Sequence, residues 1–397
     1  MLSRLKLIKI LAGSIVLTGL LSITACSSIT DIKTDISERI FGREAAEPPE
    51  PLAELKQTSS SKILWQAKIG EAGDFEFSPA VEAGYAYAAS TAGEVIKVDV
   101  LNGNQVWRVK VPENLSGGVG AGGSLVLVGT QRGSIYAYDL AGKLQWISRL
   151  SSEVLSAPKY YDGTVIVRTG DSRIFGINAN DGSRKWVYDR TTPALALRSS
   201  AGIVVDSGAV YAGFAGGKLV AVRADNGKLL WEASVAQPKG VTEIERIADI
   251  TSLPVVDGPL IYAVAYQGRI AAVDRISGRV IWNRDISSLA GLSAEDGRIF
   301  VSHAAGSIYA LDYTTGKTFW RQAALKNRQL TAPIPLGSLI AVGDVEGYVH
   351  FLSRDDGALA SRIQTNKSPI MPQMALINSN TILAQTRDGG IFAVQVK

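Results

Sequence analysis

The chain has 397 residues, of which 46% are hydrophobic and 20% are charged, and its formal net charge is +4. This composition, with 40 glycines, is typical of a folded, turn-rich domain with a sizeable core and excludes an intrinsically disordered chain. Residues 1–25 hold three basic and no acidic residues, so 38 basic and 37 acidic residues remain, a balance that argues against nucleic-acid binding.

Residues 1–25 have the pattern of an export signal. Three basic residues precede an uncharged, mostly apolar run from Ile10 to Ala25, which is a little short for a membrane span. The following Cys26 is the only cysteine, and Ser27 comes next. The segment resembles a bacterial lipoprotein signal, which implies cleavage before Cys26, lipid on Cys26 and anchoring at the periplasmic face of the outer membrane. The alternative is an uncleaved signal anchor with an incidental cysteine.

Residues 26–61 are predicted to be the lipidated cysteine and a flexible linker. The segment Glu44–Pro51 and the run Gln57–Ser61 are polar or rich in proline and poor in core-forming residues. We therefore expect three parts, which are the signal peptide 1–25, the lipidated linker 26–61 and a folded domain 62–397.

Seven tryptophans recur along the folded domain at intervals of roughly 40 residues, the period of a propeller blade. Six of them follow a glycine by four residues. The seven are Trp65, Trp107, Trp146, Trp186, Trp231, Trp282 and Trp320. Apolar residues alternate with other residues before each turn, as at Ile135 and Ala137, which predicts half-buried strands. Each unit is predicted to hold four strands, the innermost entered near Pro79, Pro158, Pro254 or Pro333.

Counting the units predicts a closed ring. Six units end in Trp107 to Trp320, a seventh has Ala360 at the tryptophan position, and the eighth supplies only three strands. The isolated strand around Trp65 can complete that last unit. We therefore predict an all-β, eight-bladed β-propeller of four-stranded antiparallel blades, closed by the N-terminal strand.

The polar residues of the repeat are explained by turns rather than by catalysis. Asp99, Asp139, Asp274 and Asp312 each open a turn that a glycine closes, where a carboxylate can accept backbone N–H groups. His303 and His350 are predicted to lie in strands of separate blades. No spacing typical of a metal site, a phosphate-binding loop or an activated nucleophile occurs, so we expect no catalytic residue, no metal and no cofactor.

Two consecutive connections between blades are longer than the others. Trp186 and Trp231 are 45 residues apart, and Trp231 and Trp282 are 51 apart. The extra residues precede the innermost strands of the fourth and fifth blades, so both insertions should emerge side by side on one face. Their residues combine an apolar centre, an arginine and surrounding charges, a composition typical of interfaces. They are Leu195, Leu197, Arg198, Glu243, Glu245, Arg246 and Asp249. Alternatively, the two leucines plug the centre of the ring.

The segment Gly306–Trp320, with the sequence GSIYALDYTTGKTFW, resembles the repeat of pyrroloquinoline-quinone dehydrogenases. Such enzymes use a calcium site, a catalytic aspartate and often a disulfide between adjacent cysteines. The single cysteine excludes that disulfide within one chain. A dehydrogenase-like enzyme is therefore the alternative function, not the expected one.

The chain is more similar to the BamB family, the lipoproteins of the outer-membrane β-barrel assembly machinery. The resemblance includes the signal, the eight units and the segments PALALRSSAG from Pro193, TEIERIADI from Thr242 and VGDVEGYVHFLSRDDG from Val342. It implies a non-enzymatic scaffold that binds the periplasmic POTRA region of BamA, within the whole Bam complex, and assists nascent outer-membrane proteins. A propeller that binds another envelope partner is a further alternative.

The family's partner-binding residues can be carried over to this sequence. Its leucine, leucine and arginine fall on Leu195, Leu197 and Arg198, and its two acidic residues fall on Asp249 and Thr251. Thr251 departs from the family pattern, since threonine accepts a hydrogen bond but brings no charge.

Overall fold

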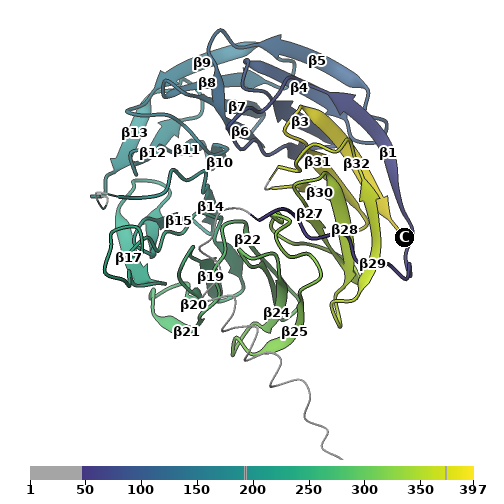
Figure 1. Cartoon of the computed structure of the whole chain (residues 1–397). Coiled ribbons are helices and arrows are strands. Elements are labelled where there is room, and N and C mark those ends of the chain that lie inside the picture. Colours follow the sequence, from purple (N-terminus) through teal and green to yellow (C-terminus); the bar gives the residue numbers. More distant parts are fainter. Residues whose placement is uncertain (1–46, 192, 194, 372) are drawn as a thin grey trace, which may run out of the picture. The chain divides into compact units, whose positions relative to one another are not determined.

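The computed structural model describes residues 47–191, 193, 195–371 and 373–397, so the predicted signal segment and Cys26 lie outside the described residues. Eight four-stranded antiparallel sheets are arranged around a central axis (Figure 1). This confirms the predicted eight-bladed β-propeller. Within the described residues, no helix long and apolar enough to cross a membrane is found.

The strands of the first four blades follow the chain without interruption. Blade 1 holds β2 (Ala80–Glu82), β3 (Tyr85–Ala89), β4 (Glu94–Asp99) and β5 (Gln105–Lys110), and blade 2 holds β6 (Leu115–Gly122), β7 (Leu125–Thr130), β8 (Ser134–Asp139) and β9 (Leu144–Arg149). Blade 3 holds β10 (Lys159–Tyr161), β11 (Thr164–Arg168), β12 (Ile174–Asn178) and β13 (Arg184–Tyr188), and blade 4 holds β14 (Ile203–Asp206), β15 (Ala209–Phe214), β16 (Lys218–Arg223) and β17 (Leu229–Ser234).

Blades 5 to 7 repeat this order, whereas blade 8 takes its outer strand from the N-terminal end of the domain. Blade 5 holds β18 (Val255–Asp257), β19 (Leu260–Val264), β20 (Ile270–Asp274) and β21 (Val280–Arg284), and blade 6 holds β22 (Gly291–Glu295), β23 (Arg298–Ser302), β24 (Ile308–Asp312) and β25 (Thr318–Gln322). Blade 7 holds β26 (Ile334–Leu336), β27 (Leu339–Gly343), β28 (Tyr348–Ser353) and β29 (Leu359–Gln364), and blade 8 holds β30 (Ala375–Asn378), β31 (Thr381–Gln385), β32 (Gly390–Val396) and β1 (Ser61–Lys68).

The N-terminal strand closes the ring as predicted. β1 pairs antiparallel with β32, from Ser61 opposite Val396 to Lys68 opposite Gly390. The inner strands β10, β18 and β26 each begin directly after one of the predicted entry prolines. Main-chain pairing between the two ends of the domain thus leaves no open junction in the ring.

The middle strands of the blades are buried on both sides, unlike the half-buried strands predicted from the alternation. All of β7 and β11 is buried, because each blade is covered on both faces by its neighbours. Alternation is clearest in outer strands such as β17, where Trp231 and Ala233 point inward between exposed residues. The alternating pattern therefore describes the rim of the ring and not its core.

The tryptophans join each blade to the next one. Every indole N–H donates to a carbonyl of the following blade, and the seven acceptors are Val100, Leu140, Ala179, Ala224, Arg275, Tyr313 and Arg354. The turn glycine of that following blade lies beneath the ring. A Cβ on Gly227 would stand 2.5 Å from the Trp186 ring, and Gly227 has a φ of +71°. The glycine thus permits both the turn and the contact with tryptophan.

The strand order gives the ring two different faces. Each outer strand ends on the face where the next inner strand begins, and we call this face, with its connections between blades, the loop face. The opposite face, which we call the turn face, carries the short Asp–Gly turns that end in Gly103 or Gly316. On the loop face, the connections 189–202 and 235–254 have 14 and 20 residues, whereas connection 111–114 has 4.

Candidate functional site

The two long connections lie side by side on the loop face, which confirms the predicted neighbourhood. The link between them is Asp249, whose carboxylate accepts hydrogen bonds from the backbone N–H groups of Leu197, at 2.7 Å, and Gly216, at 2.9 Å. Asp249 is only 3% exposed. One oxygen therefore positions the first connection and the other positions the turn between β15 and β16, so Asp249 holds the surface together from beneath.

A buried arginine lies under this link. Arg168 donates to the Ala201 carbonyl at 2.7 Å, and its guanidinium lies 4.8 Å from the centre of the Phe214 ring. Burial lowers the pKa of Arg168 to about 10, and the nearby Asp249 carboxylate opposes this shift. Arg168 remains charged at neutral pH, so it supplies a compensating charge for the buried Asp249.

The two predicted leucines differ in exposure. Leu195 is 42% exposed, whereas Leu197 is half-buried and lines a cavity of about 290 Å³ together with Arg168 and Asp249. The mouth of the central channel has a separate cavity of about 280 Å³, whose lining includes Thr251 but neither leucine. Neither leucine lines the channel mouth, so the two leucines do not plug it.

Arg198 is held in a fixed geometry beside Leu197. Its Nε and one terminal nitrogen donate to the two carboxylate oxygens of Glu153, at 3.0 and 2.6 Å. The guanidinium also lies 4.9 Å from the centre of the Phe75 ring. Hydrogen bonds from Arg198 to Glu153 raise the pKa of the arginine. The side chain is 52% exposed, so a preorganised cation faces solvent next to an apolar side chain.

Thr251 is separated from the other predicted residues. Its hydroxyl donates to the Leu289 carbonyl at 3.3 Å, and the residue belongs to the rim of the channel mouth. The structure thus brings together Leu195, Leu197, Arg198 and Asp249, and places Thr251 toward the channel.

The second connection adds two exposed apolar residues that the sequence analysis did not select. Val241 is 91% exposed and Ile244 is 67% exposed. The turn between them is ordered, because the Glu245 carboxylate accepts from the N–H of Val241 at 2.8 Å and the Glu245 N–H donates to the Thr242 hydroxyl at 3.2 Å. Two apolar residues within a charged loop could have indicated this in the sequence, but only the charged residues of the loop were selected there.

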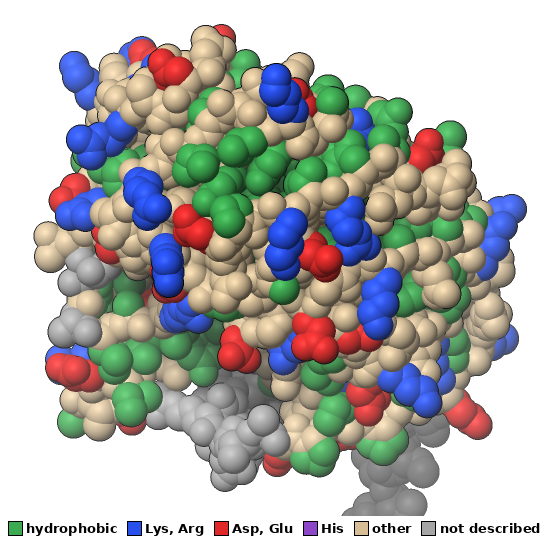
Figure 2. Space-filling view, turned by 90° about the horizontal axis from the view of Figure 1, so that it is seen from above, with side chains coloured by type: hydrophobic (Ala, Val, Ile, Leu, Met, Phe, Trp, Pro, Cys, Tyr) green, Lys and Arg blue, Asp and Glu red, His purple; other side chains and the backbone are tan. Residues whose placement is uncertain are grey.

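Other exposed apolar side chains belong to the repeat itself. Figure 2 shows hydrophobic side chains on the rim above β5 and β9, among interspersed acidic and basic ones. Residues next to the tryptophan are exposed in every outer strand that carries one. They are Leu64, Val106, Ile147, Val187, Leu230, Ile281 and Phe319. Because they recur around the ring, they do not mark one docking site.

Both histidines have structural roles in this arrangement. His303 lies just after β23, in a turn and not in a strand as predicted, and its Nδ1 accepts from the Ala305 N–H at 3.0 Å. His350 lies in β28 as predicted and is fully buried, with Nε2 2.8 Å from Asp344. In the part of the chain that the structure describes, no group of three or more His, Cys, Asp or Glu residues could hold a metal ion.

Comparison with known proteins gives one consistent result. The family model described as outer membrane protein assembly factor BamB matches residues 91–322 and 289–397. Curated proteins of that name from Nitrosomonas eutropha and Bordetella pertussis are 39% and 38% identical over 96% of this chain, which corresponds to 94% and 96% of their own lengths.

Solved structures agree with these matches. The crystal structure of BamB from Moraxella catarrhalis has a TM-score of 0.78 at 30% identity and covers 85% of this chain and 100% of its own. The quinohemoprotein alcohol dehydrogenase from Comamonas testosteroni has a TM-score of 0.70 at 14% identity, over 90% of this chain and 82% of its own, and shares the fold alone. The chain therefore belongs to the BamB family of outer membrane protein assembly factors.

Proposed function

We propose that the chain is a non-enzymatic scaffold lipoprotein of the outer-membrane β-barrel assembly complex that binds the periplasmic POTRA region of BamA. The observation that carries this proposal is the 39% identity over 96% of the chain to a protein named as an outer membrane assembly factor. Cleavage of residues 1–25 and lipid on Cys26 would hold the propeller at the periplasmic face of the outer membrane. More than one acyl chain would make that anchoring stable.

The loop face offers a suitable docking surface, made of Leu195, Leu197, Arg198, Val241 and Ile244. The exposed Leu195 can enter an apolar pocket of the partner, and the other apolar residues enlarge the contact. Arg198 is already oriented by Glu153, so a partner acceptor would meet a guanidinium that loses little further freedom on binding.

Asp249 would act through this surface rather than by direct contact. Its carboxylate fixes the backbone at Leu197, so its loss would disorder the neighbouring Arg198 as well. Thr251 lies outside this surface, at the rim of the channel mouth, where its hydroxyl donates to the Leu289 carbonyl.

The test is co-purification of BamA with variants of this surface. Leu195→Glu and Arg198→Glu should each reduce BamA recovery at least about tenfold, because each replaces a central contact by an unfavourable charge. Matched controls are Leu144→Glu, at an exposed leucine of the rim, and Arg223→Glu, at an exposed arginine of the turn face. All four variants should melt near the parent. Unchanged recovery with the loop-face variants would reject this surface.

Asp249→Asn distinguishes the positioning role from a contact role. An amide keeps one acceptor but loses the charge that faces Arg168, so both the melting temperature and BamA recovery should fall. A loss of recovery without any change in melting temperature would instead indicate direct contact by Asp249.

The enzyme alternative makes the opposite prediction. Protein reconstituted with pyrroloquinoline quinone and calcium should then reduce a dye in the presence of alcohols or sugars, and we expect no such activity. Cross-linking in cells, followed by identification of the partner, separates a BamA scaffold from a scaffold for another envelope protein.

A further inference from the structure

The last residues of the predicted flexible linker are packed on the propeller. Residues 47–60, which we call the strap, are extended across blade 7 (Figure 1). The strap and the blade are joined by hydrogen bonds at both ends and in the middle. These are Glu50 N–H to Lys326 O at 3.2 Å, Arg328 to Glu50 O at 2.7 Å, Arg362 to Ala53 O at 2.9 Å, and the N–H groups of Thr58 and Ser59 to Ala360 O at 2.9 and 3.3 Å.

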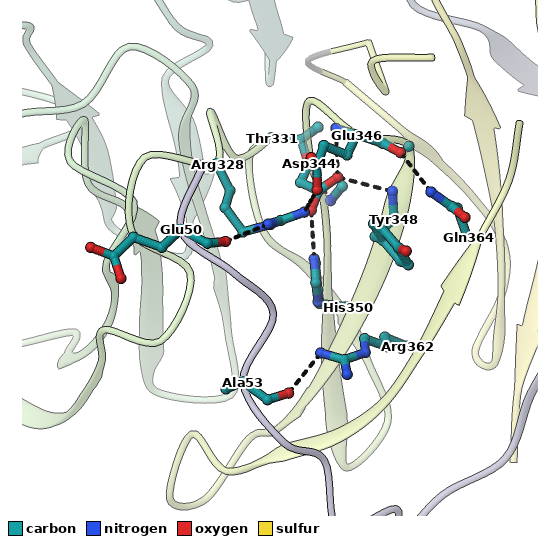
Figure 3. Close-up of polar contacts among 12 residues, drawn as sticks. Glu50, Ala53, Arg328, Thr331, Asp344, Glu346, Tyr348, His350, Arg362 and Gln364 are labelled. Carbon is teal, nitrogen blue, oxygen red and sulfur yellow. Dashed lines mark hydrogen bonds and ion pairs between the residues drawn. The ribbon is translucent and has the colours of Figure 1, made fainter. Parts of the chain in front are cut away.

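The strongest of these anchors is Arg328, which a buried network holds in place (Figure 3). Its side chain is 1% exposed and its Nε lies 2.7 Å from Asp344, while a terminal nitrogen contacts Glu346. Asp344 also accepts from His350 at 2.8 Å. The remaining terminal nitrogen donates to the Glu50 carbonyl of the strap. Because a buried donor without a partner is costly, the network favours an occupied strap position.

Charge and shape add to this preference. The carboxylates of Glu47 and Glu50 lie 3.9 and 3.6 Å from the Lys326 ammonium, which assists docking although each exposed pair contributes little. At the other end, the strand pairing places Ser361, and not Ala360 as predicted, where other outer strands have tryptophan, since Ser361 lies opposite Phe351 as Trp320 lies opposite Ala310. The carbonyl of the preceding Ala360 accepts the two strap N–H groups.

The strap changes the face from which the chain leaves the propeller. β1 begins at Ser61 on the turn face, because outer strands run from the turn face to the loop face. Glu50, by contrast, lies against Lys326 in the connection between β25 and β26, on the loop face. The docked strap therefore brings the chain from one face to the other.

We infer that blade 7 carries a docking site for the chain's own residues 47–60, and that this docking makes the linker leave from the face that bears Leu195 and Arg198. The consequence for orientation rests on the proposed lipid anchor at Cys26. With the strap docked, residues 27–46 span at most about 70 Å from the loop face. With the strap released, residues 27–60 span about 115 Å from the opposite face. Docking of the strap on blade 7 thus keeps the loop face, with its proposed BamA-binding surface, on the membrane side of the ring.

Hydrogen exchange on the full mature chain tests the docking site without any partner. The variant Lys326→Glu/Arg362→Glu removes two anchors of the strap and leaves the buried Arg328 intact. Its matched control, Lys228→Glu/Arg279→Glu, makes the same charge change at exposed positions in blades 4 and 5, away from the strap. Amides of residues 50–59 should exchange at least about tenfold faster in the first variant than in the parent and the control. Equal rates in all three proteins would overturn the docking site.

The inferred orientation has its own test in lipid nanodiscs. Because Cys26 is the only cysteine and would be lipidated, Val241→Cys or Leu101→Cys supplies a single thiol on the loop face or the turn face. A nickel-chelating lipid increases the relaxation rate of a nitroxide that lies near the membrane. If the strap is docked, this increase should be larger for a nitroxide at position 241 than for one at position 101. Lys326→Glu/Arg362→Glu should abolish or reverse this order. The reverse order in the parent would overturn the inferred exit face, whatever the outcome of the BamA co-purification.

Discussion

Seven of the eight junctions between blades depend on one side chain, and the junction between blades 7 and 8 depends on the main chain. At the junction between blades 3 and 4, Trp186 packs on Gly227 and donates to the Ala224 carbonyl at 3.0 Å. At the exceptional junction, Ala360 accepts two strap N–H groups instead. The difference shows that the tryptophan needs a turn in the next blade on which to pack.

Blade 8 cannot provide that turn. Its third and fourth strands, β32 and β1, come from opposite ends of the domain and are not connected by a turn. Ser60 and Lys397 instead exchange backbone hydrogen bonds at 3.0 and 2.9 Å. The missing tryptophan at position 361 is therefore a consequence of how the ring is closed, and not a degenerate repeat.

The largest expected effect comes from removing a tryptophan at a regular junction. Trp186→Ala should lower the free energy of unfolding by about 3–5 kcal/mol, since a buried aromatic ring and its hydrogen bond are both lost. Denaturant unfolding followed by circular dichroism measures this loss. Leu230→Ala, at a half-exposed position of the rim, is the control and should change the value by less than about 1 kcal/mol. A similar loss in both variants would contradict the junction's special role.

The opposite substitution tests the exceptional junction. If the repeat pattern alone determined stability, Ser361→Trp would stabilise the ring by restoring the eighth tryptophan. Because Ser361 is fully buried and follows Ala360, whose carbonyl is used by the strap, we expect instead a loss of about 1–3 kcal/mol from overpacking. Faster exchange of the Thr58 and Ser59 amides should accompany it. A gain in stability would show that the strap is dispensable there.

The contrast between the junctions also shows what the sequence could predict. The period of the tryptophans, the glycines and the unpaired strand around Trp65 predicted eight blades and their closure, because each blade repeats the same local contacts. The two long connections were predicted for the same reason, since an insertion is visible against a regular period.

Features that depend on contacts between distant segments were not predictable in this way. The burial of Asp249 depends on a backbone N–H at Leu197, 52 residues away, and the strap depends on Arg328, 278 residues from Glu50. Neither pair has a characteristic spacing. Burial of the middle strands on both sides depends on neighbouring blades, so the alternation of one strand could not indicate it.

A pH-dependent effect of intermediate size is expected from blade 7. Burial lowers the pKa of His350, although its bond to Asp344 partly opposes the shift. Below about pH 6.5 the unfolded chain therefore binds a proton that the folded chain does not, so stability falls as the pH falls further. The slope from this one group is at most about 1.4 kcal/mol per pH unit. His350→Gln should give a flatter stability profile between pH 6.5 and 5, and an unchanged slope would contradict this assignment.

The smallest expected effect separates the regular turns from the turn of blade 7. Asp312 accepts the N–H groups of Thr314 and Thr315 at 3.1 and 2.7 Å, and hydrogen bonds from their hydroxyls hold its pKa below the usual range. In blade 7 the corresponding residue is Ser353, whose hydroxyl accepts a single N–H at 3.3 Å. Asp312→Ala should cost about 1 kcal/mol, measured by denaturant unfolding, because the turn loses its acceptor.

Asp312→Ser would give the blade 6 turn the chemistry of the blade 7 turn, and should cost less than Asp312→Ala. One hydroxyl acceptor is already sufficient at Ser353, where Gly357 has a φ of +73° like the glycines of the other turns. The two substitutions therefore separate the need for an acceptor from the need for a charge. Equal losses in the alanine and serine variants would show that the turns need the carboxylate itself, and the geometry of blade 7 would then have to be maintained by the strap and not by its own turn.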